Sequence, residues 1–456
     1  MSDKEQDIDL IVNHPKKALI NLSIPTIISL AFTMIYFIID GIWVSGVGPN
    51  ALAAVGFVTP LFTALAGFSN SLGSGANSLI SRCIGAEQYE NAENSAVHGI
   101  MLSIILTIVL TVGLLIILKP MFLMMGAEKV IEETMAYGNI IVGGIFTIFI
   151  PIMMSAIFRS QGDIKRATYP LVLAAAINLV LDPIFIYTLG WGVAGAAFAT
   201  ALAAMIASTP MFYWMFIKND GFLKINMRSY KTNLKIYKEI LVVAIPVSLE
   251  QFSISFIFVL FNYWISLLSG TVAVAAFTAA WRLVALGNTP VSAIGMSALT
   301  VGGVAYGAQN LVNLKTALNY GIKLAMVFSV LIVSLLFIFA DPLSWMFSFS
   351  QNSSVLAPPI ADSLRILCFF TLLMPFGVLS CNIFQSMGKG TYSLLIIIVR
   401  AIVLEVIFSY LFAFVLGWGL SGIYWGMVVG MAVGSVMGYL FINYYLNKHK
   451  GYFKII

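Results

Sequence analysis

Six ionisable side chains fall inside long apolar stretches of this 456-residue sequence, where burying a charge is expensive. Each is a candidate functional residue, because an ionisable group in hydrocarbon is rare unless it pairs with a partner or binds something. The six are Asp40, Asp182, Glu250, Arg282, Arg400 and Glu405. The sequence contains no P-loop, GxSxG or HExxH motif and no CxxC pair. We therefore expect no enzyme, no disulfide framework and no bound cofactor.

Two of these acids fall at one depth. Asp40 and Asp182 lie seven and eight residues before the outer ends of their apolar runs, which is about 10–12 Å at 1.5 Å per residue. Asn178 shares a helical face with Asp182, and Thr200 lies at a similar depth in the next run. Carboxylate, amide and hydroxyl oxygens suit a hard cation such as Na⁺, whereas two neighbouring carboxylates suit a proton carrier. Alternatively, each aspartate merely satisfies a polar neighbour or trapped water.

The second half of the chain offers no matching acid pair. The positions aligned with Asp40 and Asp182 are Phe261 or Asn262 and Ser409, so ion coupling is expected to be asymmetric. Arg400 and Glu405 are five residues apart, about 140° around an α-helix, and are not expected to form an i,i+4 pair. Arg400, like Arg282, is expected to have a structural role, by pairing across helices or by snorkelling.

The elements that must hold these residues are membrane helices. Hydrophobic residues make up 60% of the chain and charged residues 9%, against roughly a quarter charged in a soluble domain. Runs long enough to cross about 30 Å of hydrocarbon recur throughout, so lipid is the main solvent. Twelve spans are predicted, at 18–47, 52–80, 94–118, 134–158, 167–190, 193–217, 237–268, 272–303, 314–339, 361–386, 391–416 and 420–446.

The distribution of basic residues predicts the topology. With twelve spans, 19 Lys and Arg fall on the side of the termini, three on the other side, and two within spans. The positive-inside rule therefore places both termini in the cytoplasm. The net charge of +5 follows from topology and implies no nucleic-acid partner. The polar N-terminal tail and the long first apolar run do not fit a cleaved signal peptide.

Sequence motifs recur at an offset of about 220–227 residues. Ile24-Pro25 matches Ile245-Pro246, Phe158-Arg-Ser-Gln-Gly162 matches Phe384-Gln-Ser-Met-Gly388, and Leu189-Gly-Trp-Gly-Val193 matches Leu416-Gly-Trp-Gly-Leu420. Six spans per half make a parallel repeat, which is typical of transporters whose lobes rock around a central cavity. The expected divisions are a tail (1–17), an N-lobe (18–217), a linker (218–236), a C-lobe (237–446) and a tail (447–456).

Several motifs resemble the multidrug and toxic compound extrusion (MATE) family, in particular its prokaryotic DinF-like branch. They are Asp40-Gly-Ile-Trp43, Leu52-Ala-Ala-Val-Gly-Phe57, Asn178-Leu-Val-Leu-Asp182-Pro-Ile-Phe185 and Leu189-Gly-Trp-Gly-Val-Ala-Gly-Ala196. The resemblance implies an all-α fold of twelve helices, in two pseudo-symmetric six-helix bundles around a central cleft.

The resemblance also implies an activity. Relatives of this kind export cationic or amphipathic compounds against entering H⁺ or Na⁺, at polar residues matching Asp40, Asn178, Asp182 and Thr200, with Tyr137 nearby. We expect a monomeric antiporter in the plasma membrane of a prokaryote, contacting lipid and a small cationic substrate. The role of an acidic residue in the seventh span of other branches does not transfer to Glu250, which is one turn too early.

Two other functions fit the sequence less well. A lipid or lipid-linked oligosaccharide flippase shares the broad architecture but lines its cavity with Arg or Lys, and only Arg282 and Arg400 lie within the predicted spans. A passive channel fits the two-lobe repeat and the buried acids less well than a rocking transporter.

Overall fold

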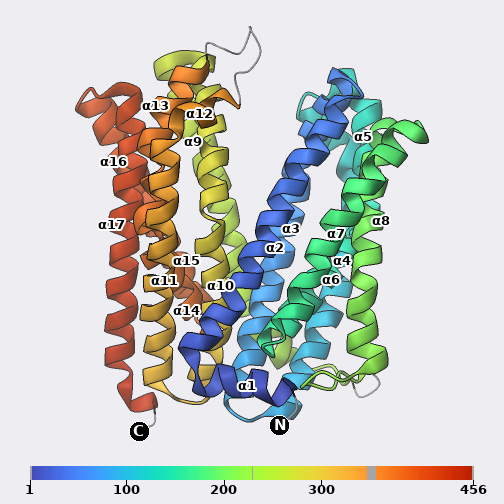
Figure 1. Cartoon of the computed structure of the whole chain (residues 1–456), viewed down its shortest axis with the longest axis vertical. Coiled ribbons are helices and arrows are strands. Elements are labelled where there is room, and N and C mark those ends of the chain that lie inside the picture. Colours follow the sequence, from blue (N-terminus) through green and yellow to red (C-terminus); the bar gives the residue numbers. More distant parts are fainter. Residues whose placement is uncertain (1–2, 228–229, 347–355, 454–456) are drawn as a thin grey trace. The chain divides into compact units, whose positions relative to one another are not determined.

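The structure, a computed structural model, describes residues 3–227, 230–346 and 356–453, and these form helices without a strand (Figure 1). Residues 1–2 and 454–456 of the expected tails and residues 228–229 of the expected linker lie outside the described residues. The all-α fold class is confirmed.

The first half of the chain, before the linker, consists mainly of long helices. Here η1 is a 3₁₀ helix, whereas η2 and η3 are π-helices. The elements are α1 (Asp3–Asn13), α2 (Pro15–Ser45), α3 (Pro49–Gly85), α4 (Tyr89–Met124), η1 (Glu128–Val130), α5 (Ile131–Gly143), α6 (Phe146–Ser160), α7 (Ile164–Pro183), η2 (Ile184–Thr188), α8 (Gly192–Phe212) and η3 (Tyr213–Lys218).

The second half repeats this plan with more π-helix. η6 and η7 are π-helices, and η8 is a 3₁₀ helix. The elements are α9 (Leu234–Gly287), α10 (Thr289–Gly307), α11 (Leu311–Ile338), α12 (Ala340–Trp345), α13 (Ala357–Leu367), α14 (Phe370–Ser386), α15 (Gly390–Ile397), η6 (Ile398–Glu405), α16 (Val406–Tyr410), η7 (Leu411–Val415), α17 (Gly419–Lys448) and η8 (Lys450–Tyr452).

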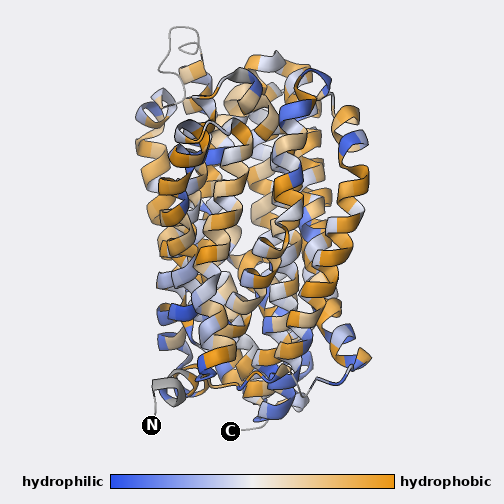
Figure 2. Ribbon diagram, turned by 90° about the vertical axis from the view of Figure 1, so that its right-hand side faces the viewer, coloured by the Kyte–Doolittle hydropathy of each residue, from blue (hydrophilic) through white to orange (hydrophobic). Residues whose placement is uncertain are grey.

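The helices provide the twelve predicted spans. Ten described helices are long and apolar enough to cross a membrane, and α13 with α14, bent by 46°, makes an eleventh. α9 supplies one more, because its backbone at Gly270 is not helical (φ 75°, ψ −172°) and the part beyond continues towards α10. A glycine suits this break, since a positive φ is strained for other residues. Apolar residues dominate along the helices, as membrane spans require (Figure 2).

The chain divides into two compact units. Unit 1 comprises Met1–His14 and Ile24–Ala244, and unit 2 comprises Pro15–Ser23 and Ile245–Ile456. Both divisions inside helices fall directly before the repeated Ile-Pro motif, in α2 and in α9. The expected linker and the first turns of α9 thus group with unit 1, whereas the first turns of α2 group with unit 2.

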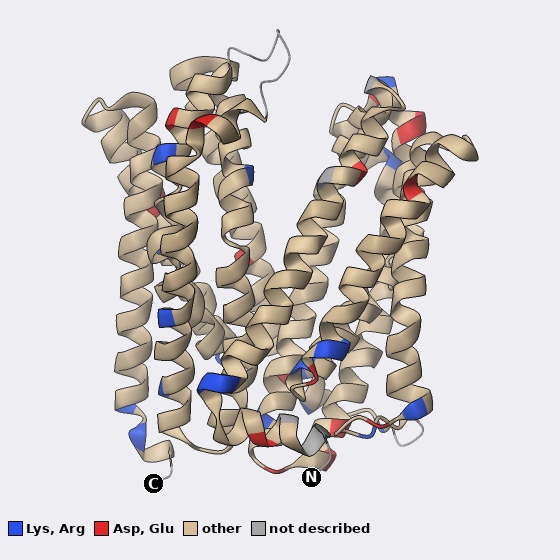
Figure 3. Ribbon diagram, viewed as in Figure 1, with Lys and Arg blue, Asp and Glu red and all other residues tan. Residues whose placement is uncertain are grey.

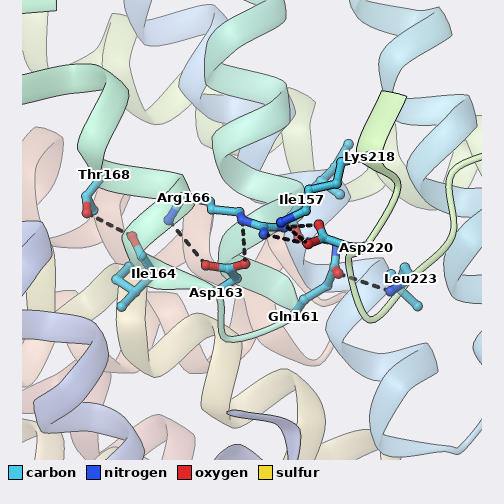
Figure 4. A network of polar contacts seen from close by, with 9 residues as sticks. All are labelled: Ile157, Gln161, Asp163, Ile164, Arg166, Thr168, Lys218, Asp220 and Leu223. Atoms are coloured by element: carbon cyan, nitrogen blue, oxygen red, sulfur yellow. Dashed lines mark hydrogen bonds and ion pairs between the residues drawn. The ribbon is translucent and has the colours of Figure 1, made fainter. Parts of the chain in front are cut away.

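The linker is held to unit 1 by polar contacts at the start of α7 (Figure 4). Arg166 forms two hydrogen bonds with Asp220, at 2.7 and 3.1 Å, and an ion pair with Asp163 at 3.4 Å. Lys218 also pairs with Asp220, at 2.9 Å. The backbone N–H of Leu223 donates to the side chain of Gln161 at 3.1 Å. This part of the linker is therefore an anchored segment rather than only a solvated loop.

Candidate functional site

Three helices of unit 1 bring four predicted site residues together. α2 carries Asp40, α7 carries Asn178 and Asp182, and α8, which packs along α7, carries Thr200. Asn178 Nδ2 donates to Asp182 Oδ1 at 3.1 Å and to Thr200 Oγ1 at 3.3 Å. Asn178 and Asp182 can interact because residues four apart share one face of an α-helix. Asp182 is fully buried, and Asn178 and Asp40 are buried as well.

The carboxyl groups of Asp40 and Asp182 lie within interaction range of each other. A hydrogen bond between two carboxyl groups requires that one of them carries a proton. Neither aspartate forms an ion pair with a described Lys, Arg or His residue. Two acids in contact without a fixed counter-charge form a site that needs a positive ion or a proton.

Two tyrosines complete the polar cluster. Tyr137, predicted from the family resemblance, is buried within electrostatic range of Asp40 and Asp182. Tyr36, which the sequence analysis missed, interacts with both aspartates and forms a side-chain hydrogen bond with Thr200. A sequence signal for it existed, because Tyr36 lies four residues before Asp40 and therefore on the same face of α2.

The oxygens of this cluster are of a kind that can bind a hard cation or a proton. No N–H or O–H donor among the described residues reaches Asp40 Oδ1, Asp182 Oδ2 or Asn178 Oδ1. Two carboxylates, an amide oxygen and the hydroxyl of Thr200 are ligands that a hard cation accepts, and the pair of acids alone can hold a proton. Among the described residues, no group of three or more His, Cys, Asp or Glu could hold a metal ion.

A contact between η2, which follows α7, and the end of α2 links the two helices that carry Asp182 and Asp40. α7 ends at Pro183, directly after Asp182, and η2 follows as a π-helix. The hydroxyl of Tyr187 in η2 donates to the backbone carbonyl of Trp43 in α2, and the two rings pack edge to face. Single-turn π-helices occur often at functional sites, where they redirect side chains.

The ionisable residues of unit 2 form a different arrangement. Arg282 is exposed on α9, whereas Glu250, Arg400 and Glu405 are buried. Arg400 Nε lies 4.0 Å from Glu405 Oε1, so the expectation that these residues do not pair along the helix is wrong. The physical reason is that both lie in the π-helix η6, whose i→i+5 periodicity aligns residues five apart.

The positions in unit 2 that align with the acid pair carry no charge. Phe261 is buried, and the hydroxyl of Ser409 donates to the backbone carbonyl of Ile423 at 3.1 Å. The acid pair is therefore a feature of unit 1 alone.

Known proteins resemble this chain over nearly its whole length. Two solved structures, described as MATE in complex with MaL6 and as an outward-facing multidrug resistance MATE transporter, are each 37% identical, cover 98% of this chain and 99% of their own, and give TM-scores of 0.95 and 0.94. A Pyrococcus furiosus protein, described as a MOP superfamily transporter, is 37% identical over 97% of this chain and 98% of its own, with a TM-score of 0.94.

Two bacterial proteins are more distant relatives. The protein named FAD transporter from Shewanella oneidensis is 26% identical over 85% of this chain and 86% of its own length. The multidrug export protein MepA from Staphylococcus aureus is 25% identical over 59% of each chain. The MatE family model matches residues 25–184 and again 246–411, which confirms the internal repeat. Through both halves of its sequence and its twelve-span fold, this chain belongs to the MATE family of multidrug efflux transporters.

Proposed function

We propose that this protein exports cationic or amphipathic organic compounds in exchange for entering H⁺ or Na⁺, with the coupling ion bound in unit 1. The observation that supports this most is the contact between Asp40 and Asp182, two lipid-buried acids without a basic partner among the described residues. A fixed structural pair would be expected to include a counter-charge. A pair of acids whose charge is unbalanced is suited to an ion that comes and goes.

The proposed cycle uses the same cluster in two states. In the outward-open state, an ion binds Asp40 and Asp182 and neutralises them, so that a cationic substrate is released. The ion then favours closure of the cleft, because a ligand shifts a conformational equilibrium by its differential affinity for the two states. Asn178 and Thr200 orient the carboxyl groups through the hydrogen bonds donated by the amide. Competition between ion and substrate makes the exchange obligatory.

Transport in reconstituted vesicles tests this proposal. Proteoliposomes receive an imposed proton gradient or sodium gradient separately, and the movement of ethidium, a cationic dye, is recorded. We expect Asp40→Asn and Asp182→Asn to abolish gradient-driven transport, and Asp362→Asn, a change at an exposed acid of unit 2, to leave it intact. Normal uphill transport by both aspartate variants would refute the proposed coupling, and the gradient that drives the wild type identifies the ion.

The same proteoliposome assay tests two substrate classes besides organic cations. The Shewanella relative is named FAD transporter, so FAD is tested as a second cargo. A lipid-linked oligosaccharide tests the flippase alternative, which is not favoured because the relatives are named as a multidrug export protein and a FAD transporter. Efflux of ethidium but not of either competitor supports the cationic assignment.

The expected setting is the plasma membrane of a prokaryote, with both termini in the cytoplasm and the protein a monomer. In each unit, Lys and Arg gather toward the end that carries its chain terminus, as the positive-inside rule requires of cytoplasmic ends (Figure 3). Assignment to the DinF-like branch stays a prediction from the motifs.

A further inference from the structure

A second buried ionisable cluster lies in unit 2, and the mechanism above does not use it. Glu250 comes from α9, and Arg400 and Glu405 come from η6. All three are at least 95% buried, and all lie within candidate membrane spans. Arg400 acts electrostatically on both glutamates, so the three side chains form one cluster.

The charges of this cluster do not balance. One guanidinium faces two carboxyl groups, and one negative charge is left over when both glutamates are ionised. Several neutral residues lie against the cluster: Ser393 from α15, Gln385 and Cys381 from α14, and the glycines of α17. Since no second cation among these residues compensates the surplus, a proton or another positive ion must do so.

Glu250 and Glu405 differ in the hydrogen bonds that they accept. Ser393 Oγ donates to Glu250 Oε1 at 2.5 Å, and Gln385 Nε2 is 3.4 Å from Glu250 Oε2. Both oxygens of Glu250 therefore have donors, which is the environment of a carboxylate. Glu405 accepts no hydrogen bond from the described residues, and its Oε1 atom lies 4.0 Å from Arg400 Nε, beyond hydrogen-bond distance.

The geometry of Arg400 agrees with this difference. A guanidinium and a carboxylate in contact normally form hydrogen bonds of about 2.7–2.9 Å. Here Arg400 Nε is buried, lies 4.0 Å from Glu405 Oε1 and has no hydrogen-bond acceptor among the described residues. A protonated, neutral Glu405 explains why Arg400 Nε and Glu405 Oε1 do not approach to hydrogen-bond distance.

We propose that unit 2 holds a second proton-binding site, in which Glu405 carries one proton beside Arg400 and the ionised Glu250. Release of the proton leaves a Glu405 carboxylate that Arg400 can pair with, and both ions of that pair already share one face of η6. This site concerns unit 2 alone, and it does not depend on the role proposed for Asp40 and Asp182. The proposed ligand is a proton, because one proton is enough to offset the surplus negative charge of two carboxyl groups that face one guanidinium.

Infrared spectroscopy of the full-length protein in lipid nanodiscs tests the site directly, through the C=O stretching band of a protonated carboxyl group. The Asp40→Asn/Asp182→Asn protein is the background, so that acids of unit 1 do not contribute. At neutral pH we expect a carboxylic-acid band that shifts in D₂O, disappears with Glu405→Gln, and persists with Asp362→Asn. Glu250→Gln should also remove it, since one acid then remains for one guanidinium.

Thermal unfolding distinguishes the two glutamates. Glutamine mimics a protonated glutamate, so Glu405→Gln should leave the unfolding temperature near that of the background, whereas Glu250→Gln loses an ionised partner of Arg400 and should lower it. The background protein keeps all three residues of the cluster. If it shows no carboxylic-acid band at neutral pH, the proposal is overturned. Binding of ²²Na⁺ that disappears with Glu405→Gln would also overturn it, by making this a metal-ion site.

Discussion

At the scale of residues, a neutral side chain links the acids of unit 1 to the next helix. Thr200 accepts a hydrogen bond from Asn178 and also contacts the hydroxyl of Tyr36, so one hydroxyl group connects α2, α7 and α8. The hydroxyl orients Asn178, and Asn178 in turn orients Asp182 at 3.1 Å. The position of Thr200 Oγ1 therefore affects the orientation of the Asp182 carboxyl group through Asn178.

Removing that oxygen should weaken coupling without removing a charge. Thr200→Val keeps the shape of the side chain but loses a hydrogen bond worth about 1 kcal/mol, so ion affinity should fall about fivefold. Dye transport measured at a limiting ion gradient should fall by the same factor and recover when the gradient is raised. Thr200→Ser, the matched control, retains the hydroxyl and should stay close to the wild type; equal loss in both variants would point to packing instead.

At the scale of elements, glycines determine how closely α17 approaches its neighbours. A Cβ atom at Gly426 would lie 2.2 Å from Ser409 Cα, and one at Gly430 would lie 2.4 Å from Glu405 Cα. No side chain fits between these backbones. The glycines thus bring α17 into direct contact with η6 and α16, and this contact buries Glu405.

Filling one of these contacts should destabilise the helix packing. Gly426→Ala places a methyl group against fixed backbone, and we expect a loss of about 1–3 kcal/mol. Gly113→Ala is the matched control, because it lies in a spanning helix, α4, with nothing within 4 Å, and it should be neutral or gain about 0.5–1 kcal/mol. Thermal unfolding in detergent measures both. A stable Gly426→Ala protein would contradict the close approach.

The anchored linker gives a second prediction about elements. Arg166 holds Asp220 with two hydrogen bonds and also stacks over Trp214 at 5.3 Å, a geometry that lysine cannot reproduce. Arg166→Lys should therefore cost about 1 kcal/mol of stability. Lys218→Gln removes the other, half-exposed partner of Asp220 and should change stability little. Limited proteolysis of the linker provides the measurement, and equal protection in both variants would refute the anchoring role of Arg166.

At the scale of the whole molecule, the internal repeat and the distribution of Lys and Arg together predict the membrane topology. Two matches to one family model, at residues 25–184 and 246–411, agree with the internal repeat, and six predicted spans per half predict that both halves cross the membrane in one direction. The linker between them should then lie on the same side as the termini. The segment between the third and fourth spans should lie on the opposite side.

Cysteine labelling in intact cells measures this topology. In a protein whose three native cysteines are replaced, Glu132→Cys and Lys231→Cys each introduce one exposed thiol. An impermeant maleimide should label Glu132→Cys in intact cells, and Lys231→Cys only after the membrane is permeabilised. The reverse pattern would place the termini outside.

The sequence alone was sufficient for the properties that depend on local pattern. Apolar runs predicted twelve spans because hydrocarbon thickness sets helix length, and motif offsets predicted the two halves. The grouping of Asp40, Asn178, Asp182 and Thr200 was predicted from depth and helical face, which are also local quantities. The structure brings these four residues together.

Only the tertiary structure decided how helices meet and where their periodicity changes. Arg400 and Glu405 are five residues apart, which places them on different faces of an α-helix, whereas η6 is a π-helix that aligns them near Glu250 from α9. Tyr36 contacts the polar cluster of Asp40, Asn178, Asp182 and Thr200 through Thr200, a contact between helices. Neither result follows from sequence spacing, because the period of a helix and the partner of a buried polar group depend on packing against other elements.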